Sequence, residues 1–538
     1  MTLTLHTYFC LFGMNGCGTG NGEAYPIRKQ MYQSSNKRII KNTLLLYVRM
    51  LFLVLISLYT SRIVLQTLGI EDYGINNVVA GIISFLGFLT GSLSGASSRF
   101  ITFSLGKGDL IHLKKTFGNI IAIHLLFAVV ILILGETIGL WFVSTQLNIP
   151  PEREVAAFWV YQFSILTAIG SIVSMPYNAV IIAHEKMSAF AYLTIGDAIL
   201  KLGAVFLLIY LPYDKLILYA LFILCIQLFD FIVYITYCRR KFEETKSPGI
   251  KIDKPLFKEI FYYTGWTMNG NLAVFGYTQG LNILLNIFFN PAINAARGIA
   301  VQVQNIVNNF SINFQTAVNP QLTKSYAQED YPRMHQLLIS SSKFSVFLMF
   351  LICLPLSLEI DMVLKWWLGS YPAHSNSFLR LILITSILFC LANPIITSVH
   401  ATGRIKRFQI IEGSMLLMIV PLSYVLLKYF NVPPESVFIV HILIELCTQY
   451  ARIKIVLPMI EMKTNIYTKE VILPIGKVCI SGTIIPVCLY LYLPQNTLTF
   501  FIIGIVCILS VTSCIYVFGC TERERNIITS KLRTTLKR

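Results

Sequence analysis

Four of the basic side chains that lie within long apolar runs of this sequence are candidates for binding an anion. They are Arg49, Arg62, Lys201 and Arg297. Even on a lenient insertion scale, a basic residue at the centre of a membrane helix costs about 2.5 kcal/mol, so an intramembrane cation is a functional candidate. Cations attract phosphate by charge, and a guanidinium adds bidentate hydrogen bonds. The four residues therefore predict a cationic cavity for an anionic, phosphate-bearing substrate.

The spacing of the first two arginines restricts this prediction. Arg49 and Arg62 are thirteen residues apart, which on an ideal helix is about 220° of rotation. Both side chains can face one cavity only if the helix bends. The alternative interpretation of the arginines is that they reach lipid headgroups at the ends of membrane helices.

Acidic side chains within the apolar runs have two interpretations. The candidates are Asp197, Asp230, Glu412 and Glu445. Asp197 and Lys201 are four residues apart, the spacing at which two side chains pair on one face of a helix, so mutual neutralisation is the simpler interpretation. The other is coupling to protons or cations, the work that ionisable groups perform in membrane pumps.

A stripe of amides recurs at steps of three and four residues in two later runs. Its members are Gln279, Asn282 and Asn286, followed by Gln302, Asn305, Asn309 and Asn313. Such a stripe is suited to hydrogen bonds between helices. It is equally suited to the wall of a water-filled cavity, where amides would contact sugar hydroxyls.

The composition excludes an ordinary soluble protein. Mean hydropathy is +0.67 and 13% of the 538 residues are charged, which is typical of a membrane protein. The twelve cysteines contain no CxxC pair and indicate small packing residues, so we expect neither a metal nor another cofactor. The sequence lacks a phosphate loop, an HExxH motif, a nucleophile elbow and any large loop. This favours a transporter over an enzyme.

Fourteen apolar segments are long enough to span a membrane, which takes ~20 residues. This predicts an all-α integral membrane protein. The segments are 43–68, 74–104, 115–143, 155–183, 188–212, 215–238, 257–289, 293–322, 336–366, 376–402, 405–428, 435–457, 470–493 and 498–519.

A faint internal repeat groups these segments into two six-helix lobes. Residues 97–109 share small and polar positions with residues 318–330, at an offset of about 220 residues. We expect translation to begin at Met31. The predicted organisation is an N-terminal extension at 1–36, a first lobe at 37–240, a cytoplasmic linker at 241–256, a second lobe at 257–460, two further spans at 461–520 and a basic tail at 521–538.

Lysine and arginine are distributed very unevenly among the connecting turns. The turns after odd-numbered segments carry few of them, and the other turns and both termini carry most. Because cytoplasmic loops are enriched in these residues, both termini are predicted to be cytoplasmic. The net charge of +17 is thereby explained by topology and anionic lipids, and nucleic acid is not an expected partner.

The run LYTSRIVLQTLGIEDYGINNVVAGIISFLGFL, with SSRFITFSLGKGD shortly after it, resembles the oligosaccharide flippases of the polysaccharide-transporter family. These belong to the multidrug/oligosaccharidyl-lipid/polysaccharide exporter superfamily. The resemblance runs from about Lys37 onward, and its most specific part is the turn Leu68-Gly69-x-x-Asp72-Tyr73-Gly74. It implies two lobes that face each other in a V and open alternately to each side.

The resemblance also implies a substrate and a location. The substrate would be a glycan linked to polyprenyl diphosphate, flipped across the bacterial inner membrane for O-antigen, capsule or exopolysaccharide. The last two spans resemble the extra helix pair of lipid II flippases, which helps to form a groove for the lipid tail. Expected partners are this glycolipid, membrane lipids, a glycan polymerase and other export machinery.

Three other functions compete with this one. An exporter of cationic drugs needs a negative cavity, typically with an acid in the first span, but that span has two arginines and no acid. A lipid II flippase is hard to separate from a glycan flippase by sequence. A membrane glycan polymerase is disfavoured by the missing motifs and loops.

Overall fold

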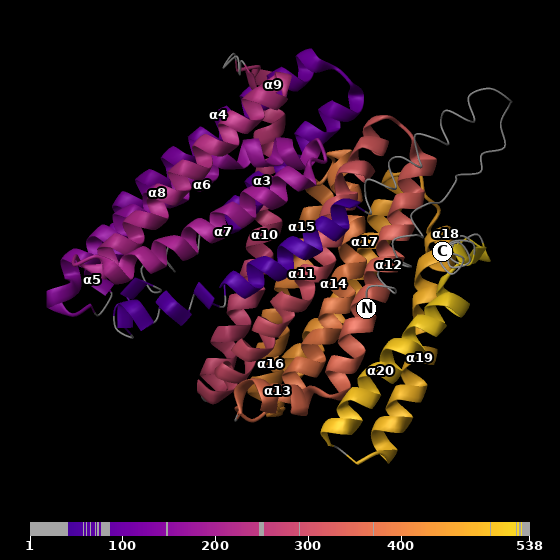
Figure 1. The fold of residues 1–538 in the computed structure, drawn as a ribbon. Coiled ribbons are helices and arrows are strands. Elements are labelled where there is room, and N and C mark those ends of the chain that lie inside the picture. Colours follow the sequence, from indigo (N-terminus) through magenta and orange to yellow (C-terminus); the bar gives the residue numbers. More distant parts are fainter. Residues whose placement is uncertain are drawn as a thin grey trace, which may run out of the picture. The chain divides into compact units, whose positions relative to one another are not determined.

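Helices make up the regular structure of every part of the chain that the computed structural model describes (Figure 1). It describes residues 41–529 except 58, 61, 65, 70–71, 73–74, 77–86, 147–148, 247–251, 290, 370, 495, 523 and 527–528. No strand occurs in these ranges, so the predicted all-α class is confirmed. The predicted N-terminal extension and most of the basic tail lie outside the described residues, as do Tyr73 and Gly74.

Eleven helices of the described part are long and apolar enough to cross a membrane. They are Lys41–Gly69, Leu110–Thr145, Pro151–Ala183, Met187–Tyr210, Lys215–Lys241, Tyr331–Leu358, Ser375–Thr402, Lys406–Phe430, Ser436–Met459, Thr464–Tyr492 and Thr497–Gly519. Three more long helices, α3 (Gly87–Lys107), α10 (Lys254–Phe288) and α11 (Pro291–Ala327), coincide with the remaining predicted spans but are richer in polar and small residues. The predicted span 336–366 is divided in the structure, because α12 (Tyr331–Leu358) ends before the short helix α13 (Ile360–Leu368).

Contacts within the chain define two compact units. The N-unit is Leu45–Asn271, and the C-unit comprises Leu272–Arg538 together with Met1–Leu44. The division falls inside α10, which contributes to both units. The lobe and linker boundaries read from the sequence stay a prediction.

The long helix α6 (Glu154–Ala183) is the centre of the N-unit. It packs against α8 (Lys215–Lys241), α3 and α4 (Leu110–Leu134), and α7 (Met187–Tyr210) lies against α8. The π-helical turn Gly135–Gly139 joins α4 to α5 (Leu140–Gln146). Asp109 caps α4, and hydrogen bonds from the backbone N–H groups of His112 and Ile111 hold the pKa of its carboxyl below the usual value.

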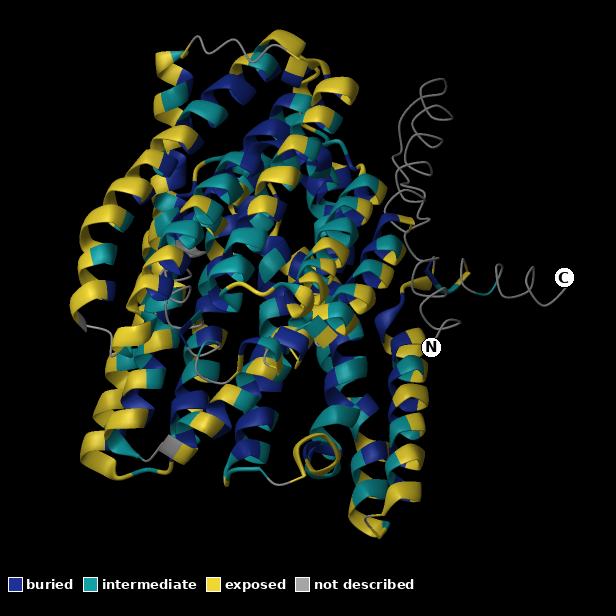
Figure 2. Ribbon diagram, turned by 60° about the vertical axis from the view of Figure 1, so that its left-hand side comes forward, coloured by how far each residue is buried: buried dark blue, intermediate teal, exposed yellow. Residues whose placement is uncertain are grey.

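The corresponding centre of the C-unit is α14 (Ser375–Thr402). It packs against α11, α12 and α17 (Ser436–Met459). Helices α15 (Lys406–Leu417) and α16 (Ile419–Phe430) pack on α17, while α19 (Leu473–Tyr492) and α20 (Thr497–Cys514) pair with each other on α12. The short helices α9 (Glu243–Lys246) and α18 (Thr464–Tyr467) and the π-helical turns Thr468–Ile472 and Ile515–Gly519 complete the described elements. Burial is concentrated where these helices face one another, and many outer faces are exposed (Figure 2).

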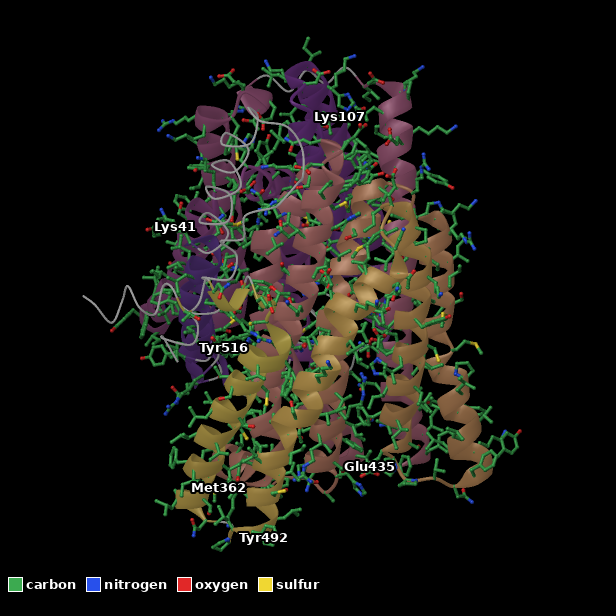
Figure 3. The ribbon with its side chains drawn as sticks, turned by 90° about the vertical axis from the view of Figure 1, so that its right-hand side faces the viewer. Lys41, Lys107, Met362, Glu435, Tyr492 and Tyr516 are labelled. Carbon is green, nitrogen blue, oxygen red and sulfur yellow. The ribbon has the colours of Figure 1, made fainter. Side chains whose placement is uncertain are left out.

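Met362, Glu435 and Tyr492 lie at the same end of the C-unit (Figure 3). Met362 lies in α13, the short helix after α12, Glu435 directly precedes α17, and Tyr492 is the last residue of α19. They lie in or beside turns that the sequence assigns to one side of the membrane. Helices of alternating direction produce this arrangement because their connections are short.

A fully buried ion pair fixes the segment after α20 to the middle of α12. The Nζ of Lys343 lies 2.9 and 2.8 Å from the two carboxylate oxygens of Glu524. The two side chains are only 2% and 3% exposed. The backbone N–H of Thr521 also donates to Glu524 at 2.6 Å, so the carboxylate is held by three donor contacts.

Replacing Lys343 by methionine is expected to lower stability by about 3–5 kcal/mol, because Glu524 would be left buried and without its cation. Thermal unfolding of the purified protein in detergent measures the effect. The double variant Lys343→Met/Glu524→Gln removes both charges and should recover most of the loss. Lys477→Met, on the exposed face of α19, is the matched control; equal unfolding temperatures for Lys343→Met and Lys477→Met would contradict the prediction.

Candidate functional site

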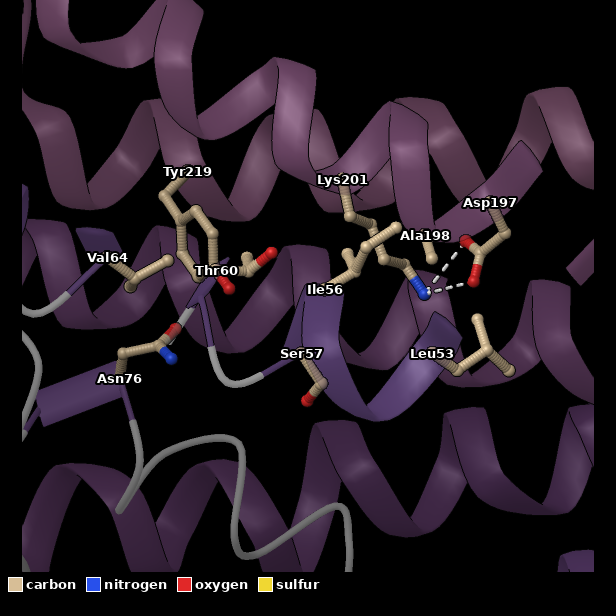
Figure 4. Close-up of a pocket in the computed structure, with 10 residues that line it drawn as sticks. All are labelled: Leu53, Ile56, Ser57, Thr60, Val64, Asn76, Asp197, Ala198, Lys201 and Tyr219. Carbon is tan, nitrogen blue, oxygen red and sulfur yellow. Dashed lines mark hydrogen bonds and ion pairs between the residues drawn. The ribbon is translucent and has the colours of Figure 1, made fainter. Parts of the chain in front are cut away.

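The N-unit contains a cavity of about 350 Å³ between the first helix, Lys41–Gly69, and helices α7 and α8 (Figure 4). Its lining mixes apolar side chains with one cation, one carboxylate and several neutral polar groups. The lining residues are Leu53, Ile56, Ser57, Thr60, Val64, Asn76, Asp197, Ala198, Lys201 and Tyr219. The structure therefore brings two predicted site residues, Asp197 and Lys201, into one cavity.

Arg49 lies on the face of the first helix that continues toward this cavity. It precedes the lining residue Leu53 by four positions, so the two side chains share a helix face. Its Nε donates to Thr194 Oγ1 at 2.7 Å, and its guanidinium lies 4.3 Å from the ring centre of Phe190. Because Thr194 precedes Asp197 by three residues on α7, Arg49 and the lining groups form one polar seam between the two helices.

The predicted pair of Asp197 and Lys201 is formed. The Nζ of Lys201 lies 2.8 Å from one carboxylate oxygen and 2.9 Å from the other (Figure 4). Both side chains are partly exposed, so the pair is solvated and contributes about 1 kcal/mol or less. Asp230 on α8 lies near Asp197, so two acids and two cations gather in the same part of the N-unit.

Arg62 is placed differently. Its side chain is exposed and does not line the cavity. Arg49 and Arg62 thus point to different surroundings, as the rotation between their positions on a helix requires. The first helix brings only one of its two arginines toward α7.

Arg297 belongs to the C-unit and is buried, with 5% exposed. It sits on α11 and donates from Nη1 to Asn282 Oδ1 and from Nη2 to the carbonyl of Thr278 at 3.0 Å, both on α10. Its Nε has no partner. Among the described residues no carboxylate pairs with Arg297, so neutral oxygens alone hold this buried charge.

The two predicted acids of the C-unit, Glu412 and Glu445, are both paired with one arginine. Arg452 on α17 pairs with Glu412 on α15, Nε to Oε1 at 2.7 Å, and with Glu445 on its own helix, Nη1 to Oε1 at 2.5 Å. The three side chains are nearly buried. Arg452 was not among the site residues predicted from the sequence, although it lies seven residues after Glu445 and therefore on the same face of α17.

The amide stripe divides into exposed and buried members. Exposed side chains are Gln279, Asn286, Gln302, Asn305 and Asn309. Asn282 binds Arg297, and buried Asn313 donates to the carbonyl of Asn309 at 2.7 Å. Amides are costly against hydrocarbon. In a membrane helix the exposed members therefore indicate a face in contact with water.

A second polar stripe on α11 was not predicted from the sequence. Gln304 donates to Thr385 on α14 at 3.1 Å. Gln315 donates to Ser345 on α12 at 3.2 Å and accepts from Asn393 on α14 at 2.6 Å. This buried stripe supplies the hydrogen bonds between helices, which leaves the exposed stripe available for water or a ligand.

Comparison with known proteins identifies the fold. No protein-family model and no curated protein matches the chain in sequence. A multidrug resistance MATE family transporter of the MOP superfamily, solved in an outward-facing conformation, matches with a TM-score of 0.67 and 14% identity over 80% of this chain and 96% of its own. The chain has the fold of these transporters. The fold predicted from the sequence is confirmed.

Two further solved structures have the same fold. A MATE transporter of Vibrio cholerae in its bent form has a TM-score of 0.65 and 14% identity over 81% of this chain and all of its own. A MOP superfamily transporter from Pyrococcus furiosus has a TM-score of 0.64 and 12% identity over 78% of this chain and 96% of its own. Identities this low support the shared fold and leave the substrate open.

Cysteine substitutions can test whether the exposed amide face contacts water. Asn305→Cys and Asn309→Cys, in a variant without native cysteines, are expected to react with a hydrophilic maleimide because thiolates form and react only where water reaches them. Leu443→Cys is the control, since Leu443 is an exposed apolar residue of α17 and should face lipid. Equal, slow labelling of all three positions would show that the amide face is not hydrated.

Proposed function

We propose that the chain is a flippase that moves an oligosaccharide linked to polyprenyl diphosphate from the cytoplasmic to the outer leaflet of the bacterial inner membrane. Alternating access would carry the glycan across, and the lipid tail would stay in the bilayer. The product would serve the synthesis of O-antigen, capsule or exopolysaccharide. The solved structures with this fold are transporters. The proposal adds the glycolipid substrate.

The observation that carries this proposal is the state of Arg297. A buried cation without a carboxylate is costly, and its neutral partners leave the charge uncompensated. A diphosphate would supply the missing negative charge, and the planar guanidinium matches its oxygens. Arg49 and Lys201 are the candidate phosphate ligands of the N-unit, and Arg62 stays a weaker candidate because its side chain is exposed outside the cavity.

The exposed amides support the glycan part of the proposal. Gln302, Asn305 and Asn309 recur on one face of α11, and Gln279 and Asn286 do so on α10. Amides donate and accept hydrogen bonds with sugar hydroxyls without adding charge. A face of this kind would hold different glycans loosely.

Coupling to an ion is proposed for the acids of the N-unit rather than those of the C-unit. Glu412 and Glu445 are both held by Arg452. Asp230 has no ion pair in the described part of the chain and lies beside Asp197. Two neighbouring carboxylates repel each other, which favours binding of a proton or cation between them, so Asp230 and Asp197 are the better candidates.

The second candidate is an exporter of cationic drugs, because one solved structure of this fold is named a multidrug resistance transporter. Against it, the first helix carries Arg49 and Arg62 and no acid. The Pyrococcus furiosus transporter is described as having a binding pocket of reversed polarity that suggests a different function. Pocket charge therefore varies within the fold, and the buried Arg297, which has no carboxylate partner among the described residues, favours an anion here.

Deletion of the gene in its host provides the test. Surface glycan should be lost and lipid-linked oligosaccharide should accumulate on the cytoplasmic side. Wild type should restore export, while Arg297→Met should lower it roughly a hundredfold, as expected for the loss of a charged contact of about 3 kcal/mol. Arg404→Gln is the control, since Arg404 is an exposed loop cation outside the site.

Other outcomes separate the candidates. Normal surface glycan with raised sensitivity to cationic dyes would support the drug exporter. Full complementation by Arg297→Met would show that Arg297 does not bind the diphosphate. Protein levels in the membrane, measured for every variant, exclude a failure to fold as the cause.

A further inference from the structure

A single arginine of the N-unit holds three turns together. Arg153 lies at the end of the 3-10 turn before α6, and its Nε donates to Asp72 Oδ1 at 2.7 Å. Its Nη2 donates to the second oxygen of Asp72, and its Nη1 donates to Asp214 Oδ2 at 2.6 Å. These three residues, the Arg153 clamp, come from the connections before α3, before α6 and before α8. One guanidinium therefore fixes the relative positions of three helical hairpins.

Asp214 connects the clamp to the direction of α8. Its Oδ1 accepts the backbone N–H groups of Leu216 and Ile217 at 3.0 and 3.1 Å, while Oδ2 accepts from Arg153. The same carboxylate thus caps the helix and joins the clamp. A shift of Arg153 would move the first turn of α8.

An apolar layer lies next to the clamp. Each clamp residue is followed closely in sequence by a buried member of this layer. Ile75 follows Asp72, Ala156 follows Arg153, and Leu216 follows Asp214. The other members come from the first helix, α5, α6, α7 and α8. They include Ile63, Val64, Leu68, Val143, Ala157, Val160, Tyr161, Ile165, Val205, Leu208 and Ala220.

The layer adjoins the cavity of the N-unit. Val64 belongs to both the layer and the cavity lining. From Thr60 in the cavity to Leu68 in the layer, the first helix rises by about 12 Å. Two more lining residues, Asn76 and Tyr219, follow Asp72 and Asp214 by four and five positions.

We infer that the Arg153 clamp and the apolar layer form a seal that closes the cavity toward the membrane face carrying these turns, the outer face in the proposed orientation. Arg153 is the positioning residue of this seal. It holds the segments that place Asn76 and Tyr219 on the cavity wall. The seal concerns access to the cavity and goes beyond the proposed substrate.

The electrostatics of the clamp make it sensitive to the loss of Arg153. The side chains of Arg153, Asp72 and Asp214 are 24%, 16% and 31% exposed. Ion pairs in such a setting are stronger than those on an open surface and weaker than fully buried ones. Without Arg153, two carboxylates of like charge would remain at neighbouring turns and repel each other. The turns would separate, and water would reach the layer more often.

Accessibility of a cysteine in the cavity tests the seal. Ser57→Cys introduces a thiol of nearly the same size into the lining, in a full-length variant whose native cysteines are replaced. A small, membrane-impermeant methanethiosulfonate is added outside intact cells. Arg153→Gln is expected to raise the labelling rate about tenfold, which corresponds to a shift of ~1.4 kcal/mol in the opening equilibrium.

The controls separate the clamp from a general effect of charge. Lys215→Gln removes a cation beside Asp214 that makes no ion pair in the described part of the chain, so its labelling rate should match the parent. Arg153→Lys should fall between parent and Arg153→Gln, because a lysine is a point charge without the fork; it also serves as the test if Arg153→Gln does not accumulate. Labelling of Arg153→Gln and Arg153→Lys at the parental rate would overturn the inference. So would an equal rise in Lys215→Gln. The assay contains no glycolipid, so its failure would leave the proposed function untouched.

Discussion

The cost of a charge away from water governs the interior of this protein. Most interior charges meet that cost by pairing: Lys343 with Glu524, and Arg452 with Glu412 and Glu445. Such pairs contribute little net stability but are very costly to break. They therefore fix which helices are neighbours. Arg297 does not follow this pattern, because it is held by neutral oxygens only, and the proposed anionic substrate rests on that exception.

The helices were predictable because they depend on local properties. Span length and apolar composition located fourteen segments, and each overlaps one or two helices in the described part of the chain. The pair of Asp197 and Lys201 was predictable for the same reason, since four residues along one helix determine the contact. Errors arose where a local signal was weak. The break between α12 and α13 passed unnoticed because apolar residues continue on both sides of Glu359, the residue at which one helix ends and the next begins.

The contacts between distant segments were not predictable. Arg452 reaches Glu412 across 40 positions, Arg153 reaches Asp72 across 81, and Lys343 reaches Glu524 across 181. An apolar helix carries no information about which neighbour its one charge will meet. The amides of α11 show a related limit, because spacing marks a helix face but does not say whether that face is buried. Exposure decides it: Gln304 and Gln315 join helices, and Gln302 and Asn305 are left open.

A flippase must also release what it binds, and the pairing of Lys201 bears on this. An unpaired lysine would hold a diphosphate strongly, whereas Lys201 already has Asp197 as a partner. The substrate would have to compete with that carboxylate, which keeps binding moderate. A proton or cation arriving at Asp197 would free the lysine and strengthen binding, and its departure would weaken it. In the proposed cycle, ion binding at the pair of Asp197 and Lys201 would thus change the affinity of the N-unit for phosphate. No separate domain would be required.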